Sequence, residues 1–199
     1  MNITPGYDNA AAYDGSFERL PAGGYICQII KAWCETTQNG SEQLALALEI
    51  SEGEYKGYFA KQYNDKRSQN QNVKWPCIFK QFTLGMDGQT NPYFKGMLKS
   101  IEESNSGYKW NWNEGSLANK FIGMIFREEE FEANDGSIKT TVRPAFPRST
   151  QRIRNGVDVP EIKRLNGNKG NAQNAPTNAF QSAQNNNFEP YDGKLPWEV

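Results

Sequence analysis

The sequence predicts a mainly β fold, a five-stranded Greek-key barrel with one or two short helices and a disordered C-terminal tail. Three observations lead to this class. Two segments have the pattern of β-hairpins, an amphipathic helical segment lies between them, and residues 166–188 are rich in Asn and Gln. With 199 residues, the chain has room for one domain and an appendage.

The first hairpin is predicted over residues 25–50. Residues 25–34 are rich in β-branched and aromatic side chains, and Asn39-Gly40 is the preferred pair of a type I′ turn, because both positions need a positive φ. In the second strand the residues alternate, and one face carries Leu44, Leu46, Leu48 and Ile50. We therefore expect a hairpin with one buried face.

The middle of the chain supplies a candidate strand and a helix. Residues 58–63 are a candidate third strand, and residues 69–84 are interpreted as a long insertion, with a helix as one option. Asn91-Pro92 is an N-cap followed by a first-turn proline. A short amphipathic helix is expected to follow it and to end near residues 105–107, because apolar residues recur at helical spacing: Phe94, Met97, Leu98 and Ile101.

The second hairpin is predicted from residues 121–132, the turn signal Asn134-Asp135-Gly136, and residues 138–143. The element order is then three strands, a helix and two strands. That is the order of the OB-fold, a five-stranded Greek-key barrel that commonly holds oligonucleotides. Gly23, Gly24, Gly53 and Gly57 are interpreted as turn glycines.

The chain divides into four predicted parts. Residues 1–20 form an N-terminal arm and residues 21–165 the OB-like domain. Residues 166–188 hold eight Asn and three Gln, and so few large apolar side chains that we expect a flexible linker. Residues 189–199 form a separate tip, because acids and large apolar side chains return beyond the polar spacer.

Composition excludes several classes of function. The absence of histidine removes Ser-His-Asp, Cys-His and His-ligated metal sites. Cys27, Cys34 and Cys77 form no CxxC pair, and no segment has the length and hydropathy of a membrane span or a signal peptide. The phosphate-binding and nucleophile-elbow motifs of enzymes are missing too. We expect a cytoplasmic protein that is not an enzyme and needs no cofactor.

An acidic run, Glu128-Glu129-Glu130 with Glu132, is the one candidate for a metal site. In a strand, residues 128, 130 and 132 point the same way, and a cation site needs oxygen ligands that converge. The run is therefore interpreted as a solvated edge that blocks strand pairing, and no metal is predicted.

The formal net charge of -1 hides two basic stretches. Between residues 55 and 82, six cations face a single acid, Asp65, and alternate with aromatic side chains. Basic groups follow phosphates and aromatic rings stack on unpaired bases, so this pattern suits single strands. The candidate binding residues of this stretch are Lys56, Tyr58, Lys61, Tyr63, Lys66, Arg67, Lys74, Trp75 and Lys80.

The second stretch has no acid from residue 139 to residue 156 and adds five candidates: Lys139, Arg143, Arg148, Arg152 and Arg154. The alternative for both stretches is a solvated basic face with its aromatic side chains in the core. Trp110 and Trp112 are further candidates. They share a face if the chain is extended there, and form either a stacking platform or a lid over the barrel end.

The tail resembles the C-terminal tip of the bacterial single-stranded DNA-binding proteins in its residues Asp192, Leu195, Pro196 and Trp197. That resemblance implies a partner-binding tip that docks onto replication or recombination proteins. Residues 20–25, Leu44 and residues 53–59 are also similar to a family of small phage and prophage proteins found among replication and recombination genes. This second resemblance implies single-stranded DNA binding in the cytoplasm of a host cell.

The sequence therefore predicts a phage-type protein that binds single-stranded DNA with little sequence preference, during replication or recombination. Two alternatives remain: an RNA-binding OB module, and a phage interaction or structural protein that does not bind nucleic acid. A homo-oligomer is left open, and no membrane partner is expected.

Overall fold

The computed structural model describes residues 2–9, 19–69 and 72–165. In these residues five antiparallel strands form one sheet in the order β3-β2-β1-β4-β5. The strands are β1 (Gly23–Thr36), β2 (Glu42–Ile50), β3 (Ile78–Phe82), β4 (Phe121–Glu132) and β5 (Ile138–Arg148). The helices are η1 (Tyr7–Asn9), α1 (Tyr58–Gln69), α2 (Pro92–Ser104), η2 (Glu114–Leu117) and α3 (Thr150–Arg154).

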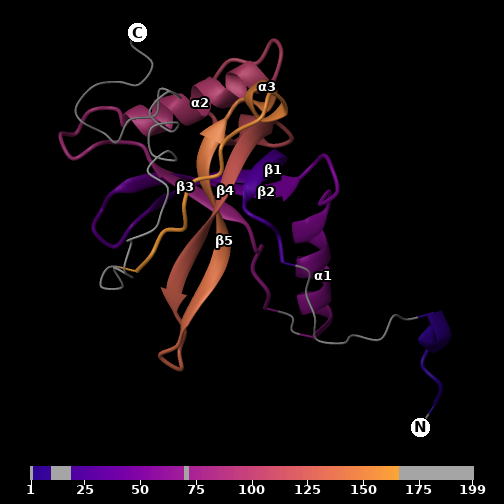
Figure 1. Cartoon of the computed structure of the whole chain (residues 1–199). Coiled ribbons are helices and arrows are strands. Elements are labelled where there is room, and N and C mark those ends of the chain that lie inside the picture. Colours follow the sequence, from indigo (N-terminus) through magenta and orange to yellow (C-terminus); the bar gives the residue numbers. More distant parts are fainter. Residues whose placement is uncertain (1, 10–18, 70–71, 166–199) are drawn as a thin grey trace.

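The expected fold class is confirmed. The strand order, with α2 between β3 and β4, is consistent with an OB-like barrel, and in the described residues the sheet stays open between β3 and β5. In Figure 1, α2 lies across the top of the sheet and α1 lies beside the sheet, on the right-hand side. The linker 166–188, the tip 189–199 and part of the N-terminal arm lie outside the described residues. Within the described part of the chain, no helix is long and apolar enough to cross a membrane.

The third strand was predicted in the wrong place. Residues 58–63 begin α1, and the strand lies at residues 78–82, inside the segment interpreted as an insertion. β3 pairs with β2 through Gln43↔Phe82, Ala45↔Lys80 and Ala47↔Ile78. Its aromatic residues made segment 58–63 resemble a strand. The start of the helix is instead stabilised by the Glu49 side chain of β2, a distant residue that the local sequence pattern does not include.

The first hairpin has the predicted strands but a different turn. Gly40 has φ +80, whereas Asn39 is not among the residues with positive φ. The N–H of Gly40 donates to the Thr37 carbonyl at 2.9 Å, and the N–H of Thr37 donates to the Ser41 carbonyl at 2.8 Å. This is the longer loop in which a turn is followed by a left-handed glycine, so the type I′ prediction is wrong. Residues 133–137 repeat the arrangement, with Gly136 at φ +77.

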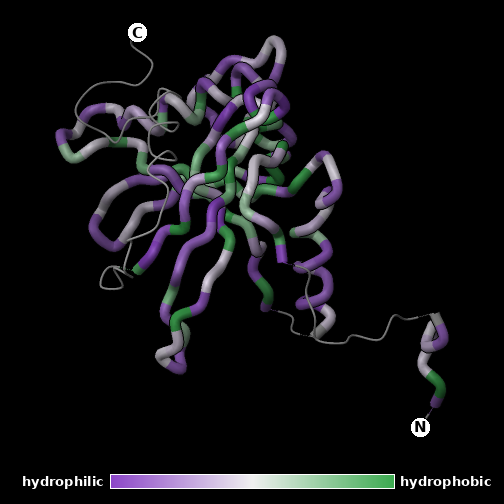
Figure 2. The backbone as a smooth tube through the Cα atoms, in the orientation of Figure 1, coloured by the Kyte–Doolittle hydropathy of each residue, from purple (hydrophilic) through white to green (hydrophobic). Residues whose placement is uncertain are grey.

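The core lies on the inner face of the sheet. It includes the four apolar residues of β2 and the helix face predicted for α2, Phe94, Met97, Leu98 and Ile101. Asn91 caps α2 as expected, because its side chain accepts a hydrogen bond from the N–H of Tyr93 at 2.9 Å. Figure 2 shows hydrophobic residues gathered where the strands cross, while α1 is largely hydrophilic.

β2 is buried on both faces, which corrects the prediction of a single buried face. Ala45, Ala47 and Glu49 point away from the core, yet at most 9% of any of them is exposed. Part of the outer surface of the sheet is also covered by α3, which packs on Gly24 and Gly123. These glycines lie within strands, so Gly24 is not a turn glycine, and neither is Gly23.

Candidate nucleic-acid interface

Three rows of paired residues cross β1, β2 and β3 on the outer face of the sheet. Strand register places Lys31 beside Ala47 and Ile78, Trp33 beside Ala45 and Lys80, and Glu35 beside Gln43 and Phe82. Paired residues of neighbouring strands share a face, and residues two apart in one strand share it too. We call these nine residues the outer face. Its two central alanines, Ala45 and Ala47, are buried beneath the larger side chains on both sides, so those larger side chains form its accessible surface.

The outer face carries aromatic rings and cations together. Phe82 is 45% exposed, Lys31 and Lys80 are exposed, and Trp33 is half-buried. The ammonium of Lys31 lies 5.9 Å from the centre of the Trp33 ring, which is within cation–π range. These groups can hold a base by stacking and a phosphate by charge.

Glu35 is the acid of the outer face. Its carboxylate lies 2.6 Å from the ammonium of Lys80 and accepts a hydrogen bond from the Trp33 indole N–H at 3.2 Å. These two hydrogen bonds, the one from Lys80 first, lower the pKa of Glu35, so its carboxyl group is ionised at neutral pH. The acid therefore orients Trp33 and restrains Lys80 beside it.

The outer face continues toward α1 through Glu49, the next outward residue of β2. Its carboxylate accepts hydrogen bonds from the N–H groups of Phe59 at 3.1 Å and Ala60 at 2.5 Å, in the first turn of α1. It also accepts one from the N–H of Ile50 at 2.8 Å. A helix begins with N–H groups that lack partners inside the helix, so this carboxylate fixes where α1 starts.

Two predicted aromatic residues meet at this end of the face. The rings of Tyr63 on α1 and Trp75 in the α1–β3 connection are 5.4 Å apart, and the Trp75 indole donates to the Leu48 carbonyl at 2.8 Å. The guanidinium of Arg67 lies 5.8 Å from the Tyr63 ring. The exposed cations nearby in the chain are Lys56, Lys61, Lys66 and Lys74. The first basic stretch is thus distributed over Lys80 on the outer face, the helix α1, and the connections on both sides of that helix.

Tyr58 has a structural environment. Its hydroxyl accepts a hydrogen bond from the N–H of Leu20 at 3.0 Å, and its ring packs edge-on against Tyr55 and Phe59. This places Tyr58 against the core cluster, where its ring supports α1 and is not presented to solvent for stacking.

The second basic stretch does not form one patch. Lys139 lies near the tip of the β4–β5 hairpin and pairs with Asp135 at 3.4 Å, whereas Arg143 is exposed further along β5. Arg154 on α3 pairs with Glu52 of the β2–α1 turn at 2.8 Å. The structure therefore separates residues that the sequence places close together.

Arg148 and Arg152 lie close to each other at the junction of β5 and α3. Burial, followed by the nearby charge of Arg152, lowers the pKa of the Arg148 guanidinium to about 10. Arg148 also donates to the Pro147 carbonyl at 2.8 Å. Arg152 is exposed, so of these two residues it is the more accessible to a ligand.

Trp110 and Trp112 differ in their exposure. Trp110 packs on the core cluster, whereas Trp112 has φ +61 and is 77% exposed. A positive φ is not extended strand, so the condition under which the two residues would share a face is not met at Trp112. The rings still approach to 6.1 Å between centres.

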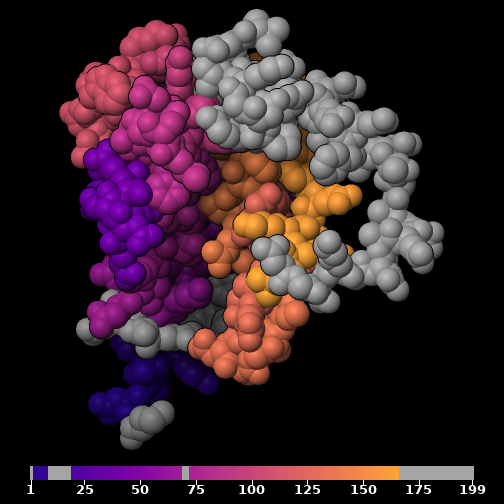
Figure 3. Space-filling model, turned by 90° about the vertical axis from the view of Figure 1, so that its left-hand side faces the viewer, coloured from indigo at the N-terminus to yellow at the C-terminus, as the bar shows by residue number. Residues whose placement is uncertain are grey.

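The acidic run is not a solvated edge. In β4 it is paired with β5 on one side, and on the other the N–H of Glu130 donates to the Lys163 carbonyl at 2.9 Å. Its carboxylates pair with Arg19, Arg127, Lys163 and Arg164. Figure 3 shows the described end of the chain, in yellow-orange, against this hairpin. Among the described residues, no group of His, Cys, Asp and Glu side chains has the arrangement of a metal site.

Lys31, Trp33 and Phe82 were missed as site residues. A signal was present, since Lys31, Trp33 and Glu35 alternate with less polar neighbours, as one face of a strand does. That pattern alone does not tell which residues of β3 lie beside them. The four candidates of the tail, Asp192, Leu195, Pro196 and Trp197, lie outside the described residues.

Residues 6–81 match the sequence family described as a protein of unknown function (DUF669). The matched segment contains β1, β2, α1 and most of β3, and with them eight of the nine residues of the outer face. No protein of curated function matches the chain. The family match therefore covers the candidate interface and leaves its ligand to be argued from the geometry.

Proposed function

We propose that this protein binds single-stranded DNA through the outer face, with little sequence preference. The observation that supports this proposal best is the strand register, which gathers Trp33, Lys80 and Phe82 around a centre of small alanines. Aromatic rings stack on the face of any base and ammonium groups pair with phosphates, so groups of this kind give little sequence preference. The protein acts by holding a strand and not by catalysis.

A single strand fits this face better than a duplex. Aromatic rings stack only on bases that are unpaired and free to turn, and each such contact contributes about 1–3 kcal/mol. In the OB-fold, the face of strands 2 and 3 and the loops between strands 1–2 and 4–5 commonly bind oligonucleotides. The outer face occupies the equivalent strands here, β2 and β3.

α1 extends the proposed site beyond the sheet. Tyr63 begins this extension and the guanidinium of Arg67 lies over its ring, while Trp75 contacts Tyr63 and packs on the core cluster. Lys61 and Lys66 are exposed on the same helix and supply charges for the phosphates of a strand that leaves the face.

The biological setting follows from the sequence resemblances. We propose a role in phage DNA replication or recombination, in which the domain coats single strands in the host cytoplasm. The tip residues Asp192, Leu195, Pro196 and Trp197 would recruit replication or recombination proteins. A chain ending at Leu165 is then expected to keep DNA binding and to lose this recruitment.

The test is a binding titration with fluorescent oligo-dT at low salt, on the full chain. Trp33→Ala and Phe82→Ala are each expected to lower the affinity by about 5- to 150-fold, the equivalent of 1–3 kcal/mol for one stacking contact. Lys99→Ala is the matched control. It removes an exposed lysine of α2, a helix that packs on the inner face of the sheet and not on the outer face.

Three outcomes decide the proposal. Loss of affinity in the two aromatic variants with an unchanged control supports it, and absence of binding by the unmodified protein at low salt overturns it. Tighter binding of oligo-rU than oligo-dT in direct competition assigns the face to RNA instead, since only RNA offers a 2′-hydroxyl.

A further inference from the structure

The loop between α2 and η2, residues 108–113, displays one large aromatic side chain to solvent. Trp112 is 77% exposed, and its backbone has φ +61. L side chains other than Asn and Asp rarely adopt this left-handed conformation, and a bulky aromatic residue does so with strain. Trp112 therefore carries a conformational cost and gains little from burial.

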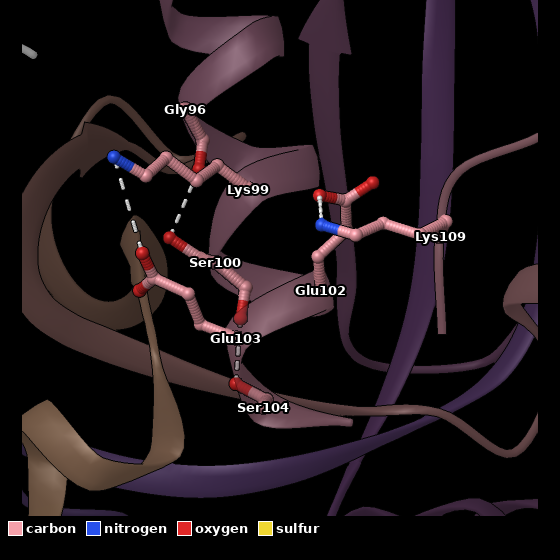
Figure 4. Close-up of polar contacts among 7 residues, drawn as sticks. All are labelled: Gly96, Lys99, Ser100, Glu102, Glu103, Ser104 and Lys109. Carbon is pink, nitrogen blue, oxygen red and sulfur yellow. Dashed lines mark hydrogen bonds and ion pairs between the residues drawn. The ribbon is translucent and has the colours of Figure 1, made fainter. Parts of the chain in front are cut away.

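The surrounding loop is held in one conformation. The Glu102 carboxylate accepts hydrogen bonds from the N–H of Trp110 at 2.9 Å and from the ammonium of Lys109 at 3.1 Å; Figure 4 shows the contact with Lys109. These hydrogen bonds lower the pKa of Glu102, and the bond from the Trp110 N–H has the largest effect. The carboxylate is therefore charged at neutral pH.

Polar side chains complete this restraint on the C-terminal side of Trp112. Asn111 accepts from the N–H of Asn113 at 3.2 Å, and Asn113 accepts from the N–H of Gly115 at 2.9 Å. The hydroxyl of Ser116 lies 2.8 Å from that of Tyr108, which links both ends of the loop. The position of Trp112 is thus preorganised.

Trp110 lies next to the exposed ring, and the two ring planes are tilted by 57°. It packs on the core cluster, its indole N–H is buried without a partner among the described residues, and its ring centre is 6.1 Å from that of Trp112. Trp110 is therefore a packing residue that lies beside the exposed ring of Trp112.

Charge indicates what the displayed ring contacts. The Lys109 side chain is 83% exposed, and the ammonium of Lys120 lies 5.0 Å from the Tyr108 ring beside it. The loop that displays the Trp112 ring thus has two ammonium groups against it, one paired with Glu102 and one over Tyr108, and a ring and cations on one loop can hold an unpaired base and its phosphate.

We propose that Trp112 is a preformed stacking platform for one base of single-stranded DNA, built separately from the outer face. The inference rests on the proposed function and adds a second contact to it. A residue kept in an unfavourable backbone conformation by its surroundings is a recognised sign of function, since packing alone does not require it. The strain here holds the ring in the orientation needed for stacking.

The decisive variant is Trp112→Gly, because glycine adopts a positive φ without strain. Its thermal midpoint of unfolding is expected to equal or exceed that of the unmodified chain. Its affinity for oligo-dT is expected to fall about 5- to 150-fold, the equivalent of losing one stacked base. Lys99→Ala, at an exposed lysine of α2 outside both proposed contacts, is again the matched control.

The outcomes separate this inference from the proposed function. Unchanged oligo-dT affinity in Trp112→Gly overturns the platform while Trp33→Ala and Phe82→Ala still test the outer face. A lower thermal midpoint in Trp112→Gly also overturns it, because the ring would then serve the fold. Loss of affinity with a preserved midpoint, and an unchanged Lys99→Ala control, supports it.

Discussion

Glu49 shows how one side chain joins two elements of this fold. It is 9% exposed, lies on β2, and its carboxylate accepts N–H groups from Ile50 and from the first turn of α1. Burial raises the pKa of this carboxyl group, and the three hydrogen bonds to the backbone oppose that shift without cancelling it. The ionised form is thus less favourable in the folded chain than in water.

The raised pKa of Glu49 predicts a pH dependence of stability. A group with a higher pKa in the folded state binds more protons there, so its stabilising contribution is present at low pH and is lost as pH rises through the folded value. The free energy of unfolding of the unmodified chain should rise relative to Glu49→Gln as pH falls from neutrality toward the ordinary range of Glu. Urea titrations of both proteins at several pH values measure this difference. A difference that does not change with pH contradicts the prediction.

At the scale of elements, α3 depends on two strand positions without side chains. A Cβ on Gly123 would lie 2.5 Å from Ile153 Cγ1 and 2.7 Å from the Ser149 carbonyl oxygen. A Cβ on Gly24 would lie 2.5 Å from Val157 Cγ2, and the other close atoms there also belong to side chains. The Ser149 carbonyl near Gly123 belongs to the backbone, so it moves aside less easily than the side-chain atoms near Gly24.

Gly123→Ala is therefore expected to destabilise the protein by about 1–3 kcal/mol, the usual range for overpacking, and to do so more than Gly24→Ala. Thermal unfolding of the two variants gives the comparison. Val157→Ala in the Gly24→Ala background should restore part of the loss, because it removes the methyl group in the way. An equal loss of stability in the two variants, or no loss in Gly123→Ala, contradicts this prediction.

α1 and β3 show why element type is hard to read from a short aromatic segment. Residues 58–63 have the aromatic content of a strand, but Glu49 satisfies the first N–H groups of a helix there. β3 has only five residues and is defined by its pairing with β2. Both assignments depend on a contact with a distant part of the chain.

For the whole molecule, a net charge near zero conceals an uneven distribution. The acids of β4 pair with Arg19, Arg127, Lys163 and Arg164, which neutralises part of the positive charge of the chain. On the outer face, Lys31 is exposed. Among the described residues, Lys80 forms an ion pair with Glu35 and with no other acid. The charges available to DNA are therefore fewer than the sequence suggests.

Salt dependence tests this distribution. Lys80→Gln should make the slope of log affinity against log salt less steep by about 0.7, the value for one phosphate contact on a single strand. Glu35→Gln should raise the affinity for oligo-dT, because it removes a negative charge from the face and releases Lys80. Titrations at several salt concentrations measure both. An unchanged slope in Lys80→Gln places the phosphates elsewhere.

The sequence by itself determined the elements that carry local signals. Both hairpins, the amphipathic face of α2 and its Asn91 cap could be predicted because alternation, turn glycines and capping act within a few residues. For the candidate site, the aromatic and basic character of Tyr63, Arg67, Trp75 and Lys80 could be predicted in the same way.

Only the tertiary structure decided which of these residues face one another. Trp33, Ala45 and Lys80 come from three strands, and only strand register sets them in one row. The backbone conformation of Trp112 leaves its ring exposed while Trp110 packs on the core, and α3 fits into the space above Gly24 and Gly123. The physical reason is the same throughout: pairing, packing and strain depend on neighbours distant in the chain, and local periodicity carries no information about them.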